Sequence, residues 1–159
     1  MAIMRIAIGA DHWGFKAKEF LKKKLRDEEI EVIDFGAPDD RRSDHPIFAD
    51  RVARSVRRGE SDRGVLICGS GIGMVIGANK VKGIRAAPAR TVEDAELSRL
   101  HNDANVLALG GKVLTPEQMW EILSVWLKTE FLGGKYKERV DMYHRIEEDL
   151  PADPNEDRN

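Results

Sequence analysis

The sequence is poor in cysteine and has no long apolar run, and both absences limit what the protein can be. Cys68 is the only cysteine among 159 residues, so no disulfide can form within the chain, and a lone thiol suits a reducing compartment. No segment approaches the ~20 apolar residues of a membrane span, and the N-terminal residues lack the apolar core of a signal peptide. We therefore expect a cytoplasmic protein with no membrane partner.

A strong charge of either sign is also missing. Lys and Arg total 26 against 28 acidic residues, which gives a net charge of -2, so no overall field attracts nucleic acid or an anionic membrane surface. Any anion that the protein binds must be held by a local cluster. We expect no nucleic-acid partner.

Length and composition indicate one domain. A chain of 159 residues with 42% hydrophobic content can bury a core of its own. No internal repeat or low-complexity linker divides it. We expect a single domain over residues 1–150 and a disordered tail over residues 151–159, because the tail is too polar to pack.

Short apolar runs alternate with amphipathic stretches, a pattern typical of a parallel sheet with helices on both faces. Capping residues support two of the helices, since Thr115 with Gln118 forms a capping-box pattern and Thr91 with Asp94 can act in the same way. Gly133 and Gly134 interrupt the chain before a last helix, which becomes a separate arm over residues 136–148. The five strands expected are residues 5–10, 30–35, 64–68, 84–87 and 104–109.

Ligands of parallel α/β sheets bind outside the carboxyl ends of the strands, so the residues at the strand ends are the candidates for a site. Asp11 and His12 follow the first strand, and Asp44 and His45 lie in the loop after the second. A glycine-rich loop follows the third strand, and His101, Asn102 and Asp103 precede the fifth. We expect these residues to form a site.

The loop after the third strand contains Gly69, Gly71 and Gly73. Closely spaced glycines let backbone N–H groups converge on an anion, although they could equally serve a tight strand-to-helix turn. No Gly-Lys-Ser or Gly-Lys-Thr follows, and the third glycine comes one residue too early for a dinucleotide fingerprint. An anion cradle is therefore favoured over a nucleotide site.

Cys68 ends the third strand at the mouth of this loop. Most cysteines in that position are buried packing residues. Next to a helix N-terminus, however, the same dipoles that would hold an anion also favour a thiolate. Cys68 is thus a candidate base for moving a proton.

Two histidines, His12 and His101, lie at strand ends and favour a function over simple packing, whereas His144 fits an exposed helix face. The histidines show no metal-ligand spacing. Asp11, His12, Asp44 and His45 could gather round a metal, but we do not favour that reading. The basic residues of the last helix form a solvated face, from which one or two could reach a phosphate; they are Lys135, Lys137, Arg139 and Arg145.

Five segments in order resemble the type B ribose-5-phosphate isomerases, a family related to the galactose-6-phosphate and allose-6-phosphate isomerases. The resemblance extends from residue 5 to about residue 147, and the cysteine-glycine loop together with residues 97–103 makes it specific. The segments are residues 9–16 (GADHWGFK), 66–73 (LICGSGIG), 78–86 (ANKVKGIRA), 98–110 (SRLHNDANVLALG) and 139–140 (RV).

The resemblance implies a Rossmann-like αβα sandwich that forms homodimers, or tetramers of paired dimers, with active sites lined by both subunits. It implies a small phosphorylated sugar as substrate and requires no metal or other cofactor. Cys68 would transfer the proton between C2 and C1, while Ser70 and the amides of Gly69, Gly71 and Gly73 would hold the enediolate. His101 would open the sugar ring. Asp11 and Asn102 would bind the hydroxyls and ring oxygen, and His12 with the neighbouring subunit's Arg139 would bind the phosphate.

The sequence departs from the family pattern at two of these places. His45 stands where many members have a tyrosine, and Lys135 stands where an arginine often precedes the last helix. A lysine offers phosphate a point charge in place of a bidentate fork, and a histidine at the edge of the sugar could alter which chain length fits. Met74 occupies the place of a glutamate used by a branch without the cysteine, which favours the cysteine branch.

Three other functions stay open at this point. The same mechanism could act on a six-carbon sugar phosphate or a free rare aldose. The chain could be a nucleotide-binding or sensory module, with Arg90 and the glycine loop around a 2′-phosphorylated dinucleotide. It could also be a metal-dependent isomerase, whose activity a chelator would abolish.

Overall fold

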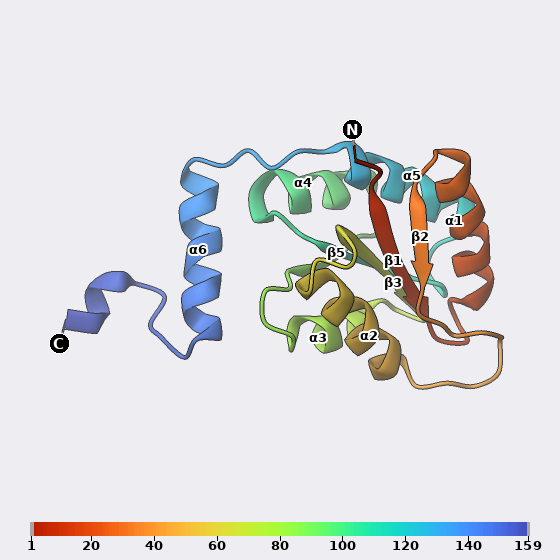
Figure 1. Ribbon diagram of the computed structural model, residues 1–159, viewed down its shortest axis with the longest axis horizontal. Coiled ribbons are helices and arrows are strands. Elements are labelled where there is room, and N and C mark those ends of the chain that lie inside the picture. Colours follow the sequence, from red (N-terminus) through yellow and green to blue (C-terminus); the bar gives the residue numbers. More distant parts are fainter. Residues whose placement is uncertain (1, 159) are drawn as a thin grey trace.

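Five parallel strands form one sheet, and helices cover both of its faces (Figure 1). This computed structural model describes residues 2–158. The predicted Rossmann-like αβα sandwich with a C-terminal helical arm is confirmed. Its elements are β1 (Arg5–Ala10), α1 (Phe15–Asp27), β2 (Glu31–Asp34), α2 (His45–Arg57), β3 (Arg63–Cys68), α3 (Ile72–Asn79), β4 (Ala86–Pro88), α4 (Val92–Asn102), β5 (Val106–Gly110), α5 (Pro116–Lys128), α6 (Lys135–Glu147) and the short 3-10 helix Pro154–Arg158.

The strand order β2-β1-β3-β5-β4 determines where a ligand can enter the sheet. The neighbours β1 and β3 send their following helices to opposite faces, because α1 packs in one core cluster and α3 in the other. The loops after β1 and β3 therefore diverge at the carboxyl edge of the sheet. A divergence of this kind leaves a crevice, where parallel α/β proteins place their ligands.

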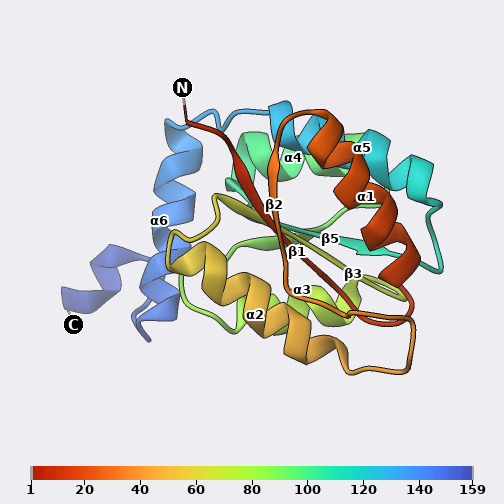
Figure 2. The same ribbon diagram turned by 45° about the vertical axis from the view of Figure 1, so that its right-hand side comes forward.

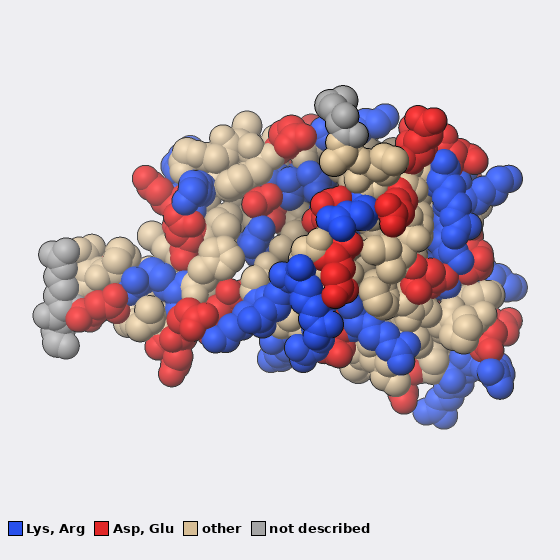
Figure 3. All heavy atoms as spheres, viewed as in Figure 1, with Lys and Arg blue, Asp and Glu red and all other residues tan. Residues whose placement is uncertain are grey.

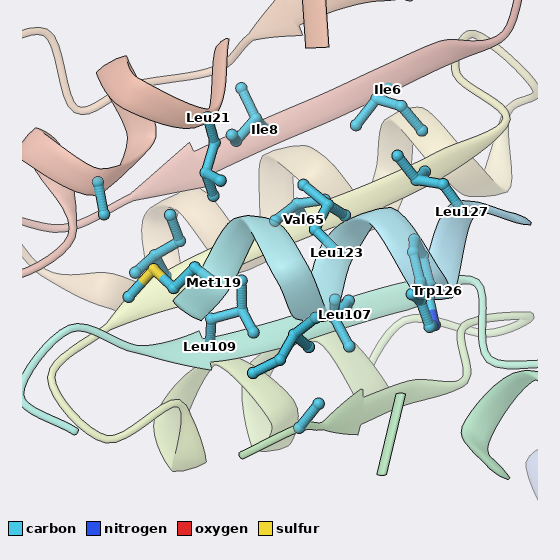
Figure 4. Close-up of a cluster of buried hydrophobic side chains, with 14 of the residues drawn as sticks. Ile6, Ile8, Leu21, Val65, Leu107, Leu109, Met119, Leu123, Trp126 and Leu127 are labelled. Carbon is cyan, nitrogen blue, oxygen red and sulfur yellow. The ribbon is translucent and has the colours of Figure 1, made fainter. Parts of the chain in front are cut away.

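The core lies in two layers, one on each side of the sheet. On one side Leu21 of α1 and Leu123 and Trp126 of α5 pack against Val65 and Leu107 of the sheet (Figure 4). On the other side residues of α2 and α3, including Val52 and Met74, pack against Leu66, Val106 and Cys68. These buried side chains make the sheet a rigid support for the loops at its edges.

Both predicted helix caps are confirmed. The Thr115 hydroxyl accepts the N–H of Gln118 at 3.2 Å and the Gln118 side chain accepts the N–H of Thr115 at 2.9 Å, which is a complete capping box. The Thr91 hydroxyl accepts the N–H of Asp94 at 3.0 Å. Local sequence thus defines where α4 and α5 begin.

The last two strands begin two residues later than the sequence pattern suggests. β4 starts at Ala86 and β5 at Val106, in place of the expected residues 84 and 104. The N–H of Ala104 donates to the carbonyl of Ser98 at 2.9 Å. Ala104 therefore completes the end of α4 and cannot pair within the sheet.

The last helix, α6, is the expected arm, although it begins at Lys135. It stands beside α4, apart from the sheet, in both ribbon views (Figures 1 and 2). Gly133 and Gly134 both have positive φ, 69° and 56°, which a glycine adopts at little cost. Residues 154–158 form a 3-10 turn, and a disordered tail after a single domain over residues 1–150 stays a prediction; Asn159 lies outside the described residues.

The surface carries charges of both signs. Acidic and basic side chains are interleaved over the face drawn in Figure 3, in keeping with the net charge of -2. Within residues 2–158, none of the helices combines the length and the apolar character needed to cross a bilayer.

A buried lysine joins α1 to the end of β2. The Lys18 side chain is 1% exposed, and its Nζ donates to Asp34 Oδ2 at 2.7 Å. Lys22 Nζ donates to the same oxygen at 2.7 Å, and the other oxygen, Oδ1, accepts the N–H of Gly36 at 2.8 Å. Burial acts to raise the pKa of Asp34, but the hydrogen bonds from Lys18 and Lys22 outweigh it, so the pKa is lowered. Asp34 thus stabilises the fold as a carboxylate.

Replacing Asp34 tests this contribution. Because its pKa is lower in the folded chain than the unfolded value of about 3.9, the stabilisation is present above about pH 4 and is lost as the pH falls through the folded pKa. We expect Asp34→Asn to lower the free energy of unfolding at neutral pH by about 2 kcal/mol, with a smaller difference in acid. Urea denaturation of both proteins at neutral pH and near pH 3 measures it, and an equal difference at the two values would contradict it.

Candidate active site

The crevice between the loops after β1 and β3 is a hollow of about 380 Å³, here called the strand-end hollow. It gathers six of the residues singled out in the sequence. The hollow lies at the topological switch point of the sheet, where the fold itself favours a ligand. Its lining residues are Asp11, His12, Trp13, Arg42, Ser43, Asp44, His45, Cys68, Gly69, Ser70, Gly73 and Lys112.

The glycine loop shapes one wall of the strand-end hollow. Gly71 has φ 82°, a left-handed conformation that leads directly into α3, and only glycine adopts it routinely. The His45 ring lies so close to Gly73 that a Cβ atom there would overlap its Nε2. Both glycines are thus required by the geometry, and the loop leaves its amides near the N-terminus of α3, where a negative charge is favoured.

Cys68 belongs both to the core and to the strand-end hollow. It is 5% exposed and packs with the α2–α3 core layer, yet it also lines the hollow. Its Sγ accepts the N–H of Gly71 at 3.2 Å. A donor directed at sulfur, next to a helix N-terminus, favours the thiolate form.

Asp11 and His12 are held in fixed orientations after β1. Asp11 is 5% exposed, and its Oδ1 accepts the N–H of Trp13 at 2.9 Å. His12 Nδ1 accepts the N–H of Ser43 at 3.2 Å. A ring nitrogen that accepts a hydrogen bond carries no proton, so a neutral His12 has its proton on Nε2, which is left as a donor for a ligand.

Lys112 lines the strand-end hollow but was not among the sequence candidates. Its Nζ lies 3.9 Å from the centre of the Trp13 ring, and its backbone N–H donates to the carbonyl of Gly69 at 2.9 Å. The side chain therefore brings a positive charge beside the glycine loop. The clue was available, because Lys112 follows the fifth strand and the same rule about carboxyl ends applies to it.

The four residues considered for a metal, Asp11, His12, Asp44 and His45, all line the strand-end hollow. Across residues 2–158, however, no three His, Cys, Asp or Glu side chains come together in a way that could hold a metal ion. A reaction without a metal stays a prediction.

Three other predicted site residues, His101, Asn102 and Arg139, lie together elsewhere, around the arm. The His101 ring stacks on Tyr136 with ring centres 4.3 Å apart, and the Arg139 guanidinium lies 5.6 Å from the centre of the same ring. Asn102 Nδ2 donates to the Tyr143 hydroxyl at 2.9 Å. We call His101, Asn102 and Arg139 the arm-side group.

The arm-side group and Cys68 lie at opposite edges of the sheet. In the ladder between β3 and β5, Cys68 is level with Gly110 and Gly64 is level with Val106. α4 ends at Asn102, before β5 begins at Val106. Four residues of strand span about 13 Å, so the expectation that His101 shares the carboxyl edge with the glycine loop is wrong. It fails because the residues before a strand lie at its amino end.

The sequence profile of the Ribose/Galactose Isomerase family matches residues 6–143, most of the chain. The chain belongs to this family. The resemblance seen in the motifs is thereby confirmed, and this ribose/galactose isomerase is an enzyme that interconverts an aldose and a ketose. The nucleotide-binding or sensory module considered from Arg90 and the glycine loop is not supported.

Individual relatives match over nearly their whole length. Ribose-5-phosphate isomerase B of Escherichia coli is 43% identical over 91% of this chain and 97% of its own. The crystal structure of ribose-5-phosphate isomerase B from Mycoplasma genitalium with bound ribulose 5-phosphate has a TM-score of 0.88 at 36% identity, covering 92% of this chain and 98% of that one. A D-erythrulose-4-phosphate isomerase of Pectobacterium atrosepticum is 39% identical over 87% of this chain and 92% of its own.

The contact between His45 and the loop gives a test of the strand-end hollow. In Gly73→Ala the new methyl group forces either the His45 ring or the glycine loop to move, and displacing an active-site group by about 1 Å can cost 100-fold in rate. We expect isomerase activity to fall about 100-fold, measured by NMR on sugar phosphates.

Gly77→Ala is the matched control, because its methyl group would lie in α3, 3.0 Å from Ala49 Cβ and outside the hollow. We expect this variant to keep its activity. Full activity of Gly73→Ala would show that the loop does not contact the reacting sugar.

Proposed function

We propose that this isomerase interconverts ribose 5-phosphate and ribulose 5-phosphate through an enediolate, with Cys68 as the base. The observation that carries the proposal is the position of the Cys68 sulfur. It lies at the N-terminus of α3, accepts the N–H of Gly71 and faces the strand-end hollow. The relatives named for this reaction support the choice of sugar.

The chemistry needs a base and a set of donors in one place. The proton on the carbon next to a carbonyl becomes removable only if the oxyanion that forms is met by hydrogen-bond donors already in position. The Cys68 thiolate takes the proton from C2 of the open aldose and returns it to C1. Ser70 and the loop amides of Gly69 and Gly73 hold the enediolate, while the Gly71 N–H stabilises the thiolate before transfer.

The phosphate is assigned to the basic groups around the strand-end hollow. His12 offers its Nε2–H because Ser43 occupies Nδ1, and Lys112 adds a charge beside the glycine loop. Arg139 of a neighbouring subunit completes the set. Asp11, held by the Trp13 N–H, accepts from a sugar hydroxyl.

The active site is proposed to be shared between two copies of the chain. The arm-side group contains the residues assigned to ring opening and to the ring oxygen, His101 and Asn102, yet it lies at the edge of the sheet opposite Cys68. No rearrangement of side chains bridges a distance set by the strands. A second copy is therefore required to bring His101 and Asn102 to the sugar.

The surface of α3 suits such a pairing. Ile72 and Ile76 are 56% and 57% exposed, which is unusual for large apolar residues of one short helix. A two-fold axis through α3 runs the two copies of this helix antiparallel and places the carboxyl edge of one sheet beside the amino edge of the other. We propose a homodimer built this way, alone or paired into a tetramer.

The runner-up substrates share the mechanism and differ in carbon number. One relative is named for D-erythrulose 4-phosphate, and a six-carbon sugar phosphate or a free rare aldose also stays possible for this site. His45 bears on the choice because its ring packs on Gly73 inside the hollow. Its size and its ring nitrogens influence which sugar length fits beside the loop.

Cys68 variants test the proposed reaction. In deuterated water the wild type is expected to convert ribose 5-phosphate to ribulose 5-phosphate and to introduce deuterium at the exchanged carbon, followed by NMR with chelator present. Cys68→Ala and Cys68→Ser lose the base, and we expect turnover to fall about 1000-fold or more. Deleting one sulfur should cost about 1 kcal/mol of stability, so both variants should stay folded.

A fully active Cys68→Ala protein would contradict the assignment of the base. No turnover of ribose 5-phosphate by folded wild type, with turnover of a four-carbon or six-carbon sugar phosphate, would keep the mechanism and change the substrate. Loss of wild-type activity on prolonged treatment with chelator, restored by a divalent ion, would show that a metal takes part.

A further inference from the structure

Asp103 ends α4 and directly follows His101 and Asn102. Its backbone is left-handed, with φ 48°, a conformation that Asp tolerates better than most residues. Its carboxylate lies between two guanidinium groups. Arg99 Nη1 donates to Oδ1 at 2.8 Å, and Arg85 Nη2 donates to Oδ2 at 3.2 Å. Both oxygens are therefore held, one from α4 and one from the segment before β4.

Arg99 connects this turn to the base of the arm. Its side chain is 6% exposed. Beyond Asp103, Nη1 donates to the carbonyl of Ala104 at 2.7 Å, and Nε donates to the carbonyl of Thr129, just after α5, at 3.2 Å. One buried guanidinium thus fixes the turn that carries the arm-side group relative to the segment that leads into α6.

Arg85 holds the turn from the opposite side. Its Nε donates to the backbone carbonyl of Asp103 at 2.8 Å, and its backbone N–H donates to the Asn105 side chain at 2.8 Å. A third cation, Arg63, lies close by. Burial, followed by the charge of Arg99, lowers the pKa of Arg63 to about 10. The Asp103 carboxylate offsets repulsion among cations crowded in a partly buried place.

The arm-side group depends on this arrangement. His101 stacks on Tyr136 and Asn102 donates to Tyr143, so both contacts require α6 to stand in register with the end of α4. The N–H of Leu132 donates to the carbonyl of Leu100 at 3.1 Å and ties the linker to the same helix. If the turn shifts, His101 and Asn102 move relative to the arm.

We propose that Asp103, held between Arg85 and Arg99, is a positioning residue for ring opening. It sets His101 and Asn102 in the geometry needed to open the sugar ring and acts through them, without touching the sugar. This inference rests on the proposed function.

The two halves of the reaction can be measured separately. Ribulose 5-phosphate is an open chain, because its C5 oxygen carries the phosphate and cannot close a five-membered ring on C2. Exchange of its C1 proton with solvent needs the base Cys68 and the glycine loop but no ring chemistry. Conversion of ribose 5-phosphate, which is mostly a ring, needs both half-reactions.

We expect Asp103→Asn to lower the turnover of ribose 5-phosphate about 100-fold, the cost of misplacing a catalytic group by roughly 1 Å. Deuterium exchange at C1 of ribulose 5-phosphate should stay within about twofold of wild type. Cys68→Ala should lose both activities. Asp62→Asn is the matched control, because it also removes a carboxylate bonded to an arginine, Arg5, and we expect no change in either activity.

A second variant guards against a folding defect. Tyr143 is 39% exposed, and Tyr143→Phe removes only the hydroxyl that accepts from Asn102. We expect a smaller loss in the same direction, with exchange retained. Unchanged turnover in Asp103→Asn, or equal loss of turnover and exchange, would overturn the inference. Absence of exchange in the wild type would instead overturn the proposed function, and the inference with it.

Discussion

The polarity of the parallel sheet is the constraint on which the rest of the structure depends. All five strands point the same way, so residues that follow strands gather at one edge and residues that precede strands gather at the other. Cys68 ends β3, whereas His101 and Asn102 come before β5. Both core layers pack tightly on the sheet, so this separation cannot relax. A site that uses both groups has to be assembled from two chains.

Each half of the site is prepared by its own part of the fold. At the carboxyl edge, the divergence of the chain after β1 and β3 opens the strand-end hollow, and a helix N-terminus with a glycine loop makes it a place for negative charge. The Gly71 N–H directed at Cys68 Sγ places the thiolate and the future oxyanion in one field. At the amino edge, aromatic contacts to α6 and the Asp103 turn hold the arm-side group. The arm is therefore best understood as part of the catalytic machinery of a neighbouring copy.

Local features were predictable from the sequence, and features that depend on long-range packing were not. The capping box at Thr115 follows from four adjacent residues, and the role of the Cys68 loop follows from a strand, three glycines and a helix in succession. The burial of Lys18 was missed because its partner Asp34 lies in another element. The location of His101 was misjudged since a position beside a strand does not say which of its ends the residue is near. Lys112 was overlooked, although the rule that identified Asp11 and His12 also applies to it.

Mixing two inactive variants tests the shared site most directly. Cys68→Ala and His101→Ala each remove one half of every site, but a mixed dimer has one site with both defects and one with neither. If equal amounts exchange subunits at random, half of the dimers are mixed, and we expect about a quarter of wild-type activity on ribose 5-phosphate to return. Recovery should follow the fraction of mixed dimers, which differently tagged chains and mass spectrometry can count. A mixture that forms mixed dimers and stays as inactive as either variant alone would contradict a site built from two chains.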